Sequence, residues 1–72
     1  MSISMSTDEI KALTEKYHIT IGTILSAEGV PSEVVAMSEH GVLRRYPDGG
    51  EEFISWTTLE YRLNTRDTCV IR

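Results

Sequence analysis

The sequence predicts an α+β fold that is mostly β: an N-terminal helix, then a small antiparallel sheet of four to five strands with a short helical turn before the last strand. Three observations predict it. A capping-box pattern precedes an apolar stripe at helical spacing, β-branched and aromatic runs fill the rest of the chain, and an Asp-Gly turn separates two of these runs. A length of 72 residues is enough for one domain, which we place at residues 6–72 after a flexible N-terminus at 1–5.

The helix is predicted over residues 7–17. Ser6-Thr7-Asp8-Glu9 fits a capping box, in which the Ser6 side chain accepts from the backbone of Glu9 and the Glu9 side chain reaches back to Ser6. One apolar stripe then follows at i, i+3 and i+7, formed by Ile10, Leu13 and Tyr17.

Residues 18–72 are rich in strand-forming side chains. We predict a first strand over 18–25, a loop over 26–32 in which Pro31 interrupts the pattern, and further strands over 33–38 and 42–46. A fourth strand is predicted over 51–56 and a last one over 68–72. Between these two, the spacing from Thr57 to Glu60 repeats a capping box and predicts a short helical turn that carries Leu59 and Leu63 and stops at Asn64.

The turn at Asp48-Gly49 sets how the third and fourth strands align. Asp-Gly favours a two-residue loop in which both central residues have positive φ. That loop pairs Arg45 with Glu52, Arg44 with Phe53 and Leu43 with Ile54. A three-residue loop is the alternative, and it aligns Val42 and Tyr46 with Trp56 instead, because a shift of one residue moves every side chain to the other face.

The two-residue loop places Leu43, Ile54 and Trp56 on one face, which we expect to form the core. The other face then carries four candidate partner-binding residues: Val42, Arg44, Tyr46 and Phe53. Aromatic side chains and arginine are enriched at the energetic centres of protein interfaces. The alternative is that the N-terminal helix covers this second face with its own apolar stripe.

The order of predicted elements resembles small SH3-like barrels, and the stretch RRYPDGGEEFISWTTLEYR resembles the hairpin-plus-turn ending of Tudor-type members. The resemblance covers residues 18–72 at the level of pattern and implies a fold without fixing a function. Tudor-like modules bind methylated side chains in an aromatic cage. We do not transfer that role to Tyr46, Phe53 and Trp56, because two of them would have to leave the core.

We find no catalytic centre, cofactor motif or metal motif in the sequence, and we expect a protein that is not an enzyme. His18, His40 and Cys69 have no metal-ligand spacing, and we expect surface histidines and a buried thiol. The adjacent Glu51 and Glu52 face opposite ways on a strand and cannot act as a carboxylate pair. Gly49-Gly50 lacks both common nucleotide-loop patterns.

Charge and composition limit the classes of partner that we expect. The net charge is −4 and no basic block exists, which disfavours generic binding to nucleic acid or to anionic membranes. A single cysteine and the absence of an apolar leader favour the cytoplasm. We therefore expect a small protein-binding module, an accessory or inhibitor subunit of the phage or mobile-element type that acts on a larger host complex. A nucleic-acid-binding barrel and a homo-oligomeric enzyme with its site at a symmetry axis remain as alternatives.

Overall fold

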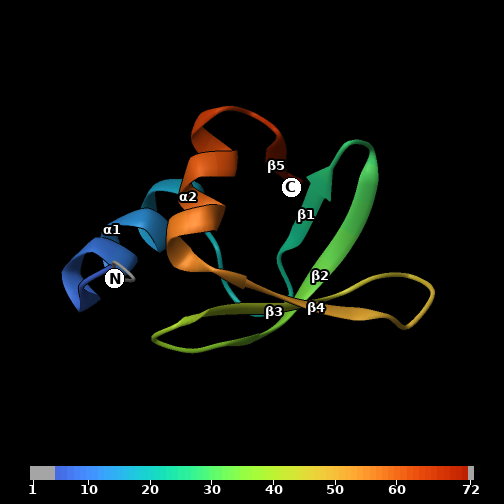
Figure 1. The fold of residues 1–72 in the computed structure, drawn as a ribbon, viewed down its shortest axis with the longest axis horizontal. Helices are drawn as coiled ribbons and strands as arrows, with labels where there is room; N and C mark the ends of the chain where they lie inside the picture. The colour runs from blue at the N-terminus through green and yellow to red at the C-terminus, as the bar shows by residue number, and fades with distance from the viewer. Residues whose placement is uncertain (1–4, 72) are drawn as a thin grey trace.

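The structure is a computed structural model that describes residues 5–71, so most of the segment 1–5 that was predicted to be flexible lies outside the described residues. Two helices and five strands make up the described chain (Figure 1). In chain order they are α1 (Thr7–Tyr17), β1 (Ile24–Ala27), β2 (Val30–Met37), β3 (Gly41–Arg45), β4 (Glu51–Ser55), α2 (Trp56–Asn64) and β5 (Thr68–Ile71). The α+β, mostly β prediction is confirmed.

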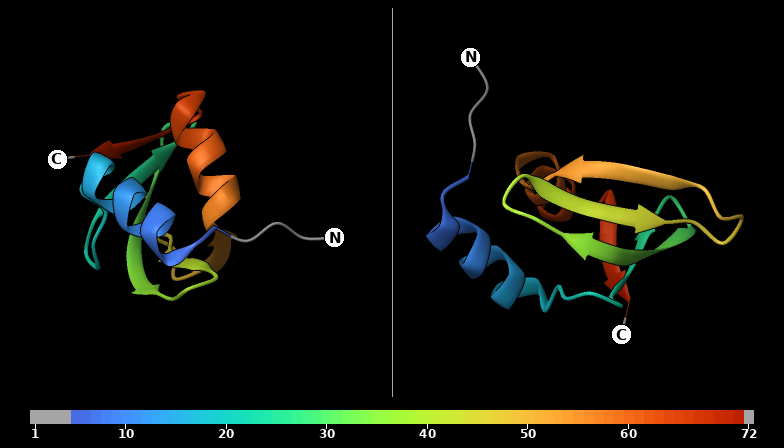
Figure 2. Two further views of the ribbon diagram at one scale, coloured as in Figure 1. Left: turned by 90° about the vertical axis from the view of Figure 1, so that its left-hand side faces the viewer. Right: turned by 90° about the horizontal axis from the view of Figure 1, so that it is seen from below.

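The five strands form one antiparallel sheet in the order β4-β3-β2-β1-β5. The sheet curves around α2, and α1 lies beside α2 at one end of the sheet (Figures 1 and 2). A hydrogen bond of 2.9 Å from the Tyr17 hydroxyl to the Asn64 side chain joins α1 to α2. The two edge strands, β4 and β5, do not pair with each other, so the sheet is not closed into a barrel.

Helix α1 confirms the prediction made from its capping box. The Ser6 hydroxyl accepts from the Glu9 backbone at 3.2 Å, and the Glu9 carboxylate accepts from the Ser6 backbone at 3.0 Å. The helix ends at Tyr17 because His18 adopts a left-handed conformation with φ of 56°.

The predicted strand over 18–25 is wrong for most of its length, because β1 begins only at Ile24. Residues 20–23 turn instead: the Thr23 backbone donates to the Thr20 carbonyl, and Gly22 has φ of 98°. The β-branched residues before Ile24 do not form a strand; Ile19 is buried in the core and Ile21 is exposed.

The predicted loop over 26–32 is also wrong, because β1 and β2 form a hairpin that turns on Glu28 and Gly29, both with positive φ. Pro31 lies within β2, opposite Ser26. That position suits a proline. Ala27 and Val30, next to the turn, form a hydrogen-bonded pair, and such pairs alternate with pairs that exchange no hydrogen bond. The Pro31 nitrogen therefore faces away from β1. On that side the pairing with β3 begins only at Glu33.

The β3–β4 hairpin has the three-residue loop, so the favoured two-residue register is wrong. The Tyr46 backbone donates to Gly50, the Gly49 backbone donates to Tyr46, and Gly49 alone in this loop has positive φ. A two-residue loop would place Pro47 opposite Gly50 in a pair that exchanges two N–H bonds, and proline has no N–H to give. The loop Pro47–Gly49 places proline where a type I turn favours it.

The register defines an inner face of the sheet, which the helices cover. Val34, Val42 and Ile54 point inward from neighbouring strands and are buried. Residues of the two helices pack on them, with Trp56 at the start of α2 exposed by only 2%. The core residues are Leu13, Ile19, Leu25, Val34, Val42, Ile54, Trp56, Leu59 and Leu63.

Helix α2 is longer than the predicted turn, and its N-cap lies two residues before Thr57. Ser55 is its N-cap, and the Ser55 hydroxyl accepts from the Thr58 backbone at 3.4 Å. Thr57, which was predicted to start the turn, is therefore already inside the helix. The predicted stop at Asn64 is confirmed.

Candidate functional site: a buried arginine at the open end of the inner face

The structure does not bring the four predicted partner-binding residues onto one face. Val42, Arg44 and Tyr46 point toward the inner face, whereas Phe53 pairs with Leu43 and lies on the outer face with 54% of its surface exposed. Val42 is completely buried in the core. The prediction of a shared face is wrong because it followed the two-residue register.

Arg44 is the most unusual of these residues, because its side chain is only 3% exposed although it carries a charge. One terminal nitrogen, Nη2, donates to the Glu52 carboxylate, which lies directly opposite on β4. The Tyr46 hydroxyl donates to the same carboxylate oxygen at 3.3 Å, and the Tyr46 ring lies 5.4 Å from the Arg44 guanidinium carbon. Glu52 therefore compensates the buried charge.

Two other nitrogens of Arg44, Nε and Nη1, are buried and have no hydrogen-bond partner among the described residues. Buried polar groups in folded proteins are nearly always hydrogen-bonded, and an unpaired one costs about 1–3 kcal/mol. The buried hydroxyl of Thr68 on β5 is also without a partner in the described part of the chain. These atoms mark a place where polar acceptors and donors are available to a ligand.

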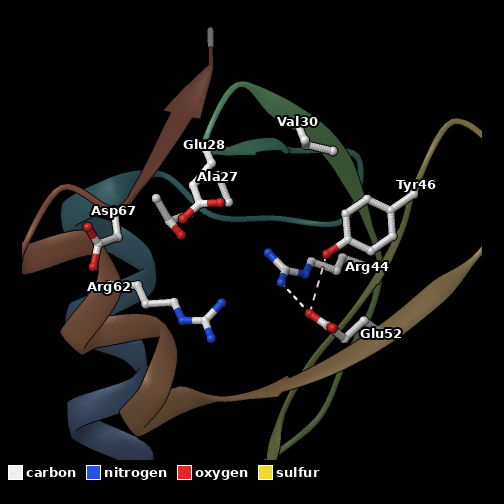
Figure 3. Close-up of a pocket in the computed structure, with 9 residues that line it drawn as sticks. Ala27, Glu28, Val30, Arg44, Tyr46, Glu52, Arg62 and Asp67 are labelled. Carbon is white, nitrogen blue, oxygen red and sulfur yellow. Dashed lines mark hydrogen bonds and ion pairs between the residues drawn. The ribbon is translucent and has the colours of Figure 1, made fainter.

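Arg44 and Thr68 line the same pocket, which has a volume of about 440 Å³. Figure 3 shows the guanidinium groups of Arg44 and Arg62 pointing toward one another across it. Arg62 comes from α2, and within residues 5–71 it makes no ion pair shorter than 4.0 Å. The pocket is lined by Ala27, Glu28, Val30, Arg44, Tyr46, Glu52, Arg62, Asp67 and Thr68.

Three carboxylates share this pocket with the two arginines, but two of them are engaged. Glu52 is bound to Arg44, and the Asp67 carboxylate accepts from the Thr65 hydroxyl at 3.2 Å. Glu28 lies in the exposed turn between β1 and β2. Arg44, with its two buried unpaired donors, and Arg62 thus line a cavity that can accept an oxygen-rich group.

The sequence predicted two members of this site, Arg44 and Tyr46, but assigned Glu52 to the wrong arginine. Glu52 binds Arg44, and Arg45 pairs with Glu51 at 2.7 Å on the outer face. The pairing of Arg44 with Glu52 belongs to the three-residue register, which was the alternative for this hairpin. Arg62 and Thr68 were missed because they reach the pocket from α2 and β5, and no local pattern relates those elements to β3.

The other candidate chemistry is not assembled. Tyr46, Phe53 and Trp56 cannot form one aromatic cage, because Phe53 is on the outer face and Trp56 is in the core. Within residues 5–71, no group of three or more His, Cys, Asp or Glu side chains is placed to hold a metal ion. The expectation of a buried thiol is wrong, since Cys69 is exposed on β5.

The hydrogen bond from Arg44 lowers the pKa of Glu52 below its ordinary value of 4.5, and the charge of Arg44 acts in the same direction. A carboxylate with a lowered folded-state pKa stabilises the fold fully above its unfolded-state pKa, and this contribution is lost as the pH falls through the folded-state pKa. We therefore expect the free energy of unfolding to fall as the pH drops below about 5. Glu9 contributes with the same sign, because its hydrogen bonds to Ser6 lower its pKa.

Urea unfolding between pH 3 and pH 7 measures this effect. At neutral pH, Glu52→Gln should lower the free energy of unfolding by about 1–2 kcal/mol, less than for a fully buried pair because the Glu52 side chain is 53% exposed. The variant should also lose less stability than the wild type on acidification. Glu51→Gln, which breaks the neighbouring exposed pair, should change the neutral-pH value by no more than about 0.5 kcal/mol. Equal losses in both variants would contradict a special role for the buried pair.

Comparisons of the chain with protein-family models, with curated proteins and with solved structures found no match. The site must therefore be interpreted from its own chemistry. Across the described residues, neither helix is long and apolar enough to cross a membrane.

Proposed function

We propose that this protein is a small non-enzymatic module that binds a larger protein or protein complex, as an accessory or inhibitor subunit, through the pocket around Arg44. One observation carries the proposal: a nearly fully buried arginine in the wall of a pocket has two N–H groups without a hydrogen-bond partner among the described residues. Burying an arginine in this way is costly for folding alone, and replacing such groups by apolar ones often stabilises a protein. A binding role gives a reason for retaining the arginine.

The surroundings of the pocket suit a protein partner. Val30, at the rim, is an exposed apolar side chain, and Tyr46 is a half-buried aromatic one with a polar tip. Tyrosine and arginine are the residue types that most often dominate interface energetics. A partner side chain that entered the pocket would be surrounded by a polar floor and a partly apolar rim.

We also propose that the fold is of the SH3-like type, and two features support this. The meander from β1 to β4, with β5 returning beside β1, and the helix placed before the last strand match the expected order of elements. The open edge between β4 and β5 departs from a closed barrel. Because a fold of this type hosts many functions, the proposal rests on the Arg44 pocket.

Affinity capture from the native host tests the function, with Arg44→Met and Arg45→Met as a matched pair. The two arginines are adjacent on β3, and each is paired with a glutamate on β4, but they face opposite sides of the sheet. Methionine keeps the length of the side chain and removes the charge and donors. We expect a partner recovered by the wild type and by Arg45→Met to be reduced at least about tenfold with Arg44→Met.

Circular dichroism and thermal unfolding must first show that both variants are folded. We expect Arg44→Met to stay folded and to lose no more than about 2 kcal/mol of unfolding free energy. The variant loses the pair with Glu52, whose carboxylate is 53% exposed and can be solvated, while methionine removes the unpaired donors from a buried site. Equal recovery of every captured protein by folded Arg44→Met and Arg45→Met would refute the proposed role of the pocket.

A further inference from the structure

Resting on the proposed function, we infer that the pocket is a receptor for a single carboxylate group, which an unpaired donor of Arg44 and the guanidinium of Arg62 hold between them. The inference names the chemistry that a partner must supply: an aspartate or glutamate side chain, or a free C-terminus. Arginine donors match carboxylate oxygens in geometry, and charge-assisted hydrogen bonds of this kind are short and strong.

The first observation is the arrangement of the N–H donors of Arg44 and Arg62 around the pocket. Glu52 takes Nη2 of Arg44 and leaves Nε and Nη1 buried without partners among the described residues; these two N–H groups point to different sides of the guanidinium, so one carboxylate can accept from only one of them. Figure 3 shows the end of the Arg44 side chain pointing into the pocket, with the Arg62 guanidinium opposite. A carboxylate placed between them would accept from both arginines. It would also relieve the repulsion between two like charges that share a small cavity.

Arg44 is held rigidly for this task. Its side chain is fixed by the Glu52 carboxylate on one side and by the face of the Tyr46 ring, 5.4 Å away. A buried, paired guanidinium loses little further side-chain freedom when a ligand binds, so less of the binding free energy is lost to ordering. The buried hydroxyl of Thr68, which has no partner within residues 5–71, offers a further polar contact at the same pocket.

The charges of the lining favour a carboxylate over a phosphate. Arg44 and Arg62 contribute two positive charges, and Glu28, Glu52 and Asp67 contribute three negative charges, so the lining sums to −1. A ligand with one negative charge can pair with Arg62 while it meets modest repulsion, mainly from Glu28. A phosphate with nearly two charges would meet about twice the net repulsion of a lining whose charges sum to −1.

NMR titration of the isotope-labelled full chain tests the inference, with the Nε–H resonances of the arginines as reporters. The probes are sodium acetate, sodium phosphate and sodium chloride at constant ionic strength. We expect acetate to shift the Arg44 and Arg62 signals in a saturable way, and phosphate to bind more weakly. Two further probes separate the sources: the α-monoamide of N-acetylaspartate carries only a side-chain carboxylate, and N-acetylglycine carries only a terminal one. The probe that binds more tightly identifies the source.

Four variants check the assignment to this pocket. Arg44→Met and Arg62→Met should each weaken acetate binding by about tenfold or more, since each removes a charge-assisted hydrogen bond. Arg45→Met should leave it unchanged. Glu28→Gln should tighten it by about two- to fivefold, because it removes the unpaired negative charge at the rim. This gain of binding cannot result from a misfolded variant.

Absence of any saturable shift with acetate, an equal response to chloride, or an equal response of the Arg45 signal would each overturn the inference. Its failure is distinguishable from failure of the proposed function. If folded Arg44→Met loses a captured partner but acetate binds nowhere in the pocket, the pocket binds protein through another chemistry. If acetate binds but no partner depends on Arg44, the carboxylate site stands and the protein-binding function fails.

Discussion

Replacing Trp56 with alanine should lower the free energy of unfolding by about 3–5 kcal/mol, which is the usual cost of truncating a buried aromatic side chain. Trp56 is 2% exposed and packs among the core residues of both helices and the sheet. Its indole N–H also donates to the Ser38 carbonyl at 2.7 Å, which ties the start of α2 to the turn before β3. A domain of this size has a total stability of roughly 4–11 kcal/mol, so the loss is a large fraction of the total.

Far-ultraviolet circular dichroism with urea measures this loss, because Trp56 is the only tryptophan and its removal abolishes the intrinsic fluorescence probe. Tyr61→Ala is the matched control: Tyr61 lies on the same helix, and 66% of its surface is exposed. We expect that control to change stability by no more than about 0.5 kcal/mol. A Trp56→Ala protein as stable as Tyr61→Ala would show that the core is not organised around α2.

Gly41→Ala should destabilise the protein by about 3 kcal/mol, at the upper end of the range for overpacking a buried site. Gly41 opens β3 and pairs with Ser55. A Cβ atom at Gly41 would come within 3.0 Å of the Ile54 carbonyl oxygen and would lie 2.8 Å from the Ser55 Cα. These are backbone atoms, so a rotamer change cannot relieve the clash and the two strands would have to separate.

Thermal unfolding of Gly41→Ala beside Gly50→Ala tests this explanation. Gly50 is the matched control, because a Cβ there would approach only the Asp48 side chain, at 3.1 Å for its nearest oxygen, which can move aside. We expect a large drop in midpoint temperature for Gly41→Ala and a small one for Gly50→Ala. Similar midpoints for the two variants would contradict the close approach of β3 and β4 at Gly41.

Local signals in the sequence predicted those features that neighbouring residues determine. Helix α1 begins and ends where the capping box and the apolar stripe predicted, because Ser6 and Glu9 satisfy each other's backbone groups without help from the rest of the fold. The end of α2 at Asn64 was predicted in the same way. Its start was not, because Ser55 and Thr57 are both acceptable caps and only the end of β4 selects Ser55.

Strand composition was a weaker guide. The β-branched run over 18–25 forms a strand only from Ile24 onward, because a strand needs a neighbour to pair with and residues 20–23 turn instead. Pro31 was treated as a break, yet it occupies a strand position where no partner requires its N–H. In both cases, the backbone pairing around the segment decided the outcome, and composition does not specify that pairing.

The sequence by itself determined the class of the fold, the first helix and the position of the β3–β4 turn, because short-range hydrogen bonds and side-chain periodicity specify these. The sequence left both registers of this hairpin open, although the missing N–H of Pro47 is a local signal against the two-residue loop. The structure has the three-residue loop, and the shift of one residue turns Arg44 inward toward Glu52 and Phe53 outward. The pocket then depends on α2 and β5, which bring Arg62 and Thr68 to Arg44 through packing.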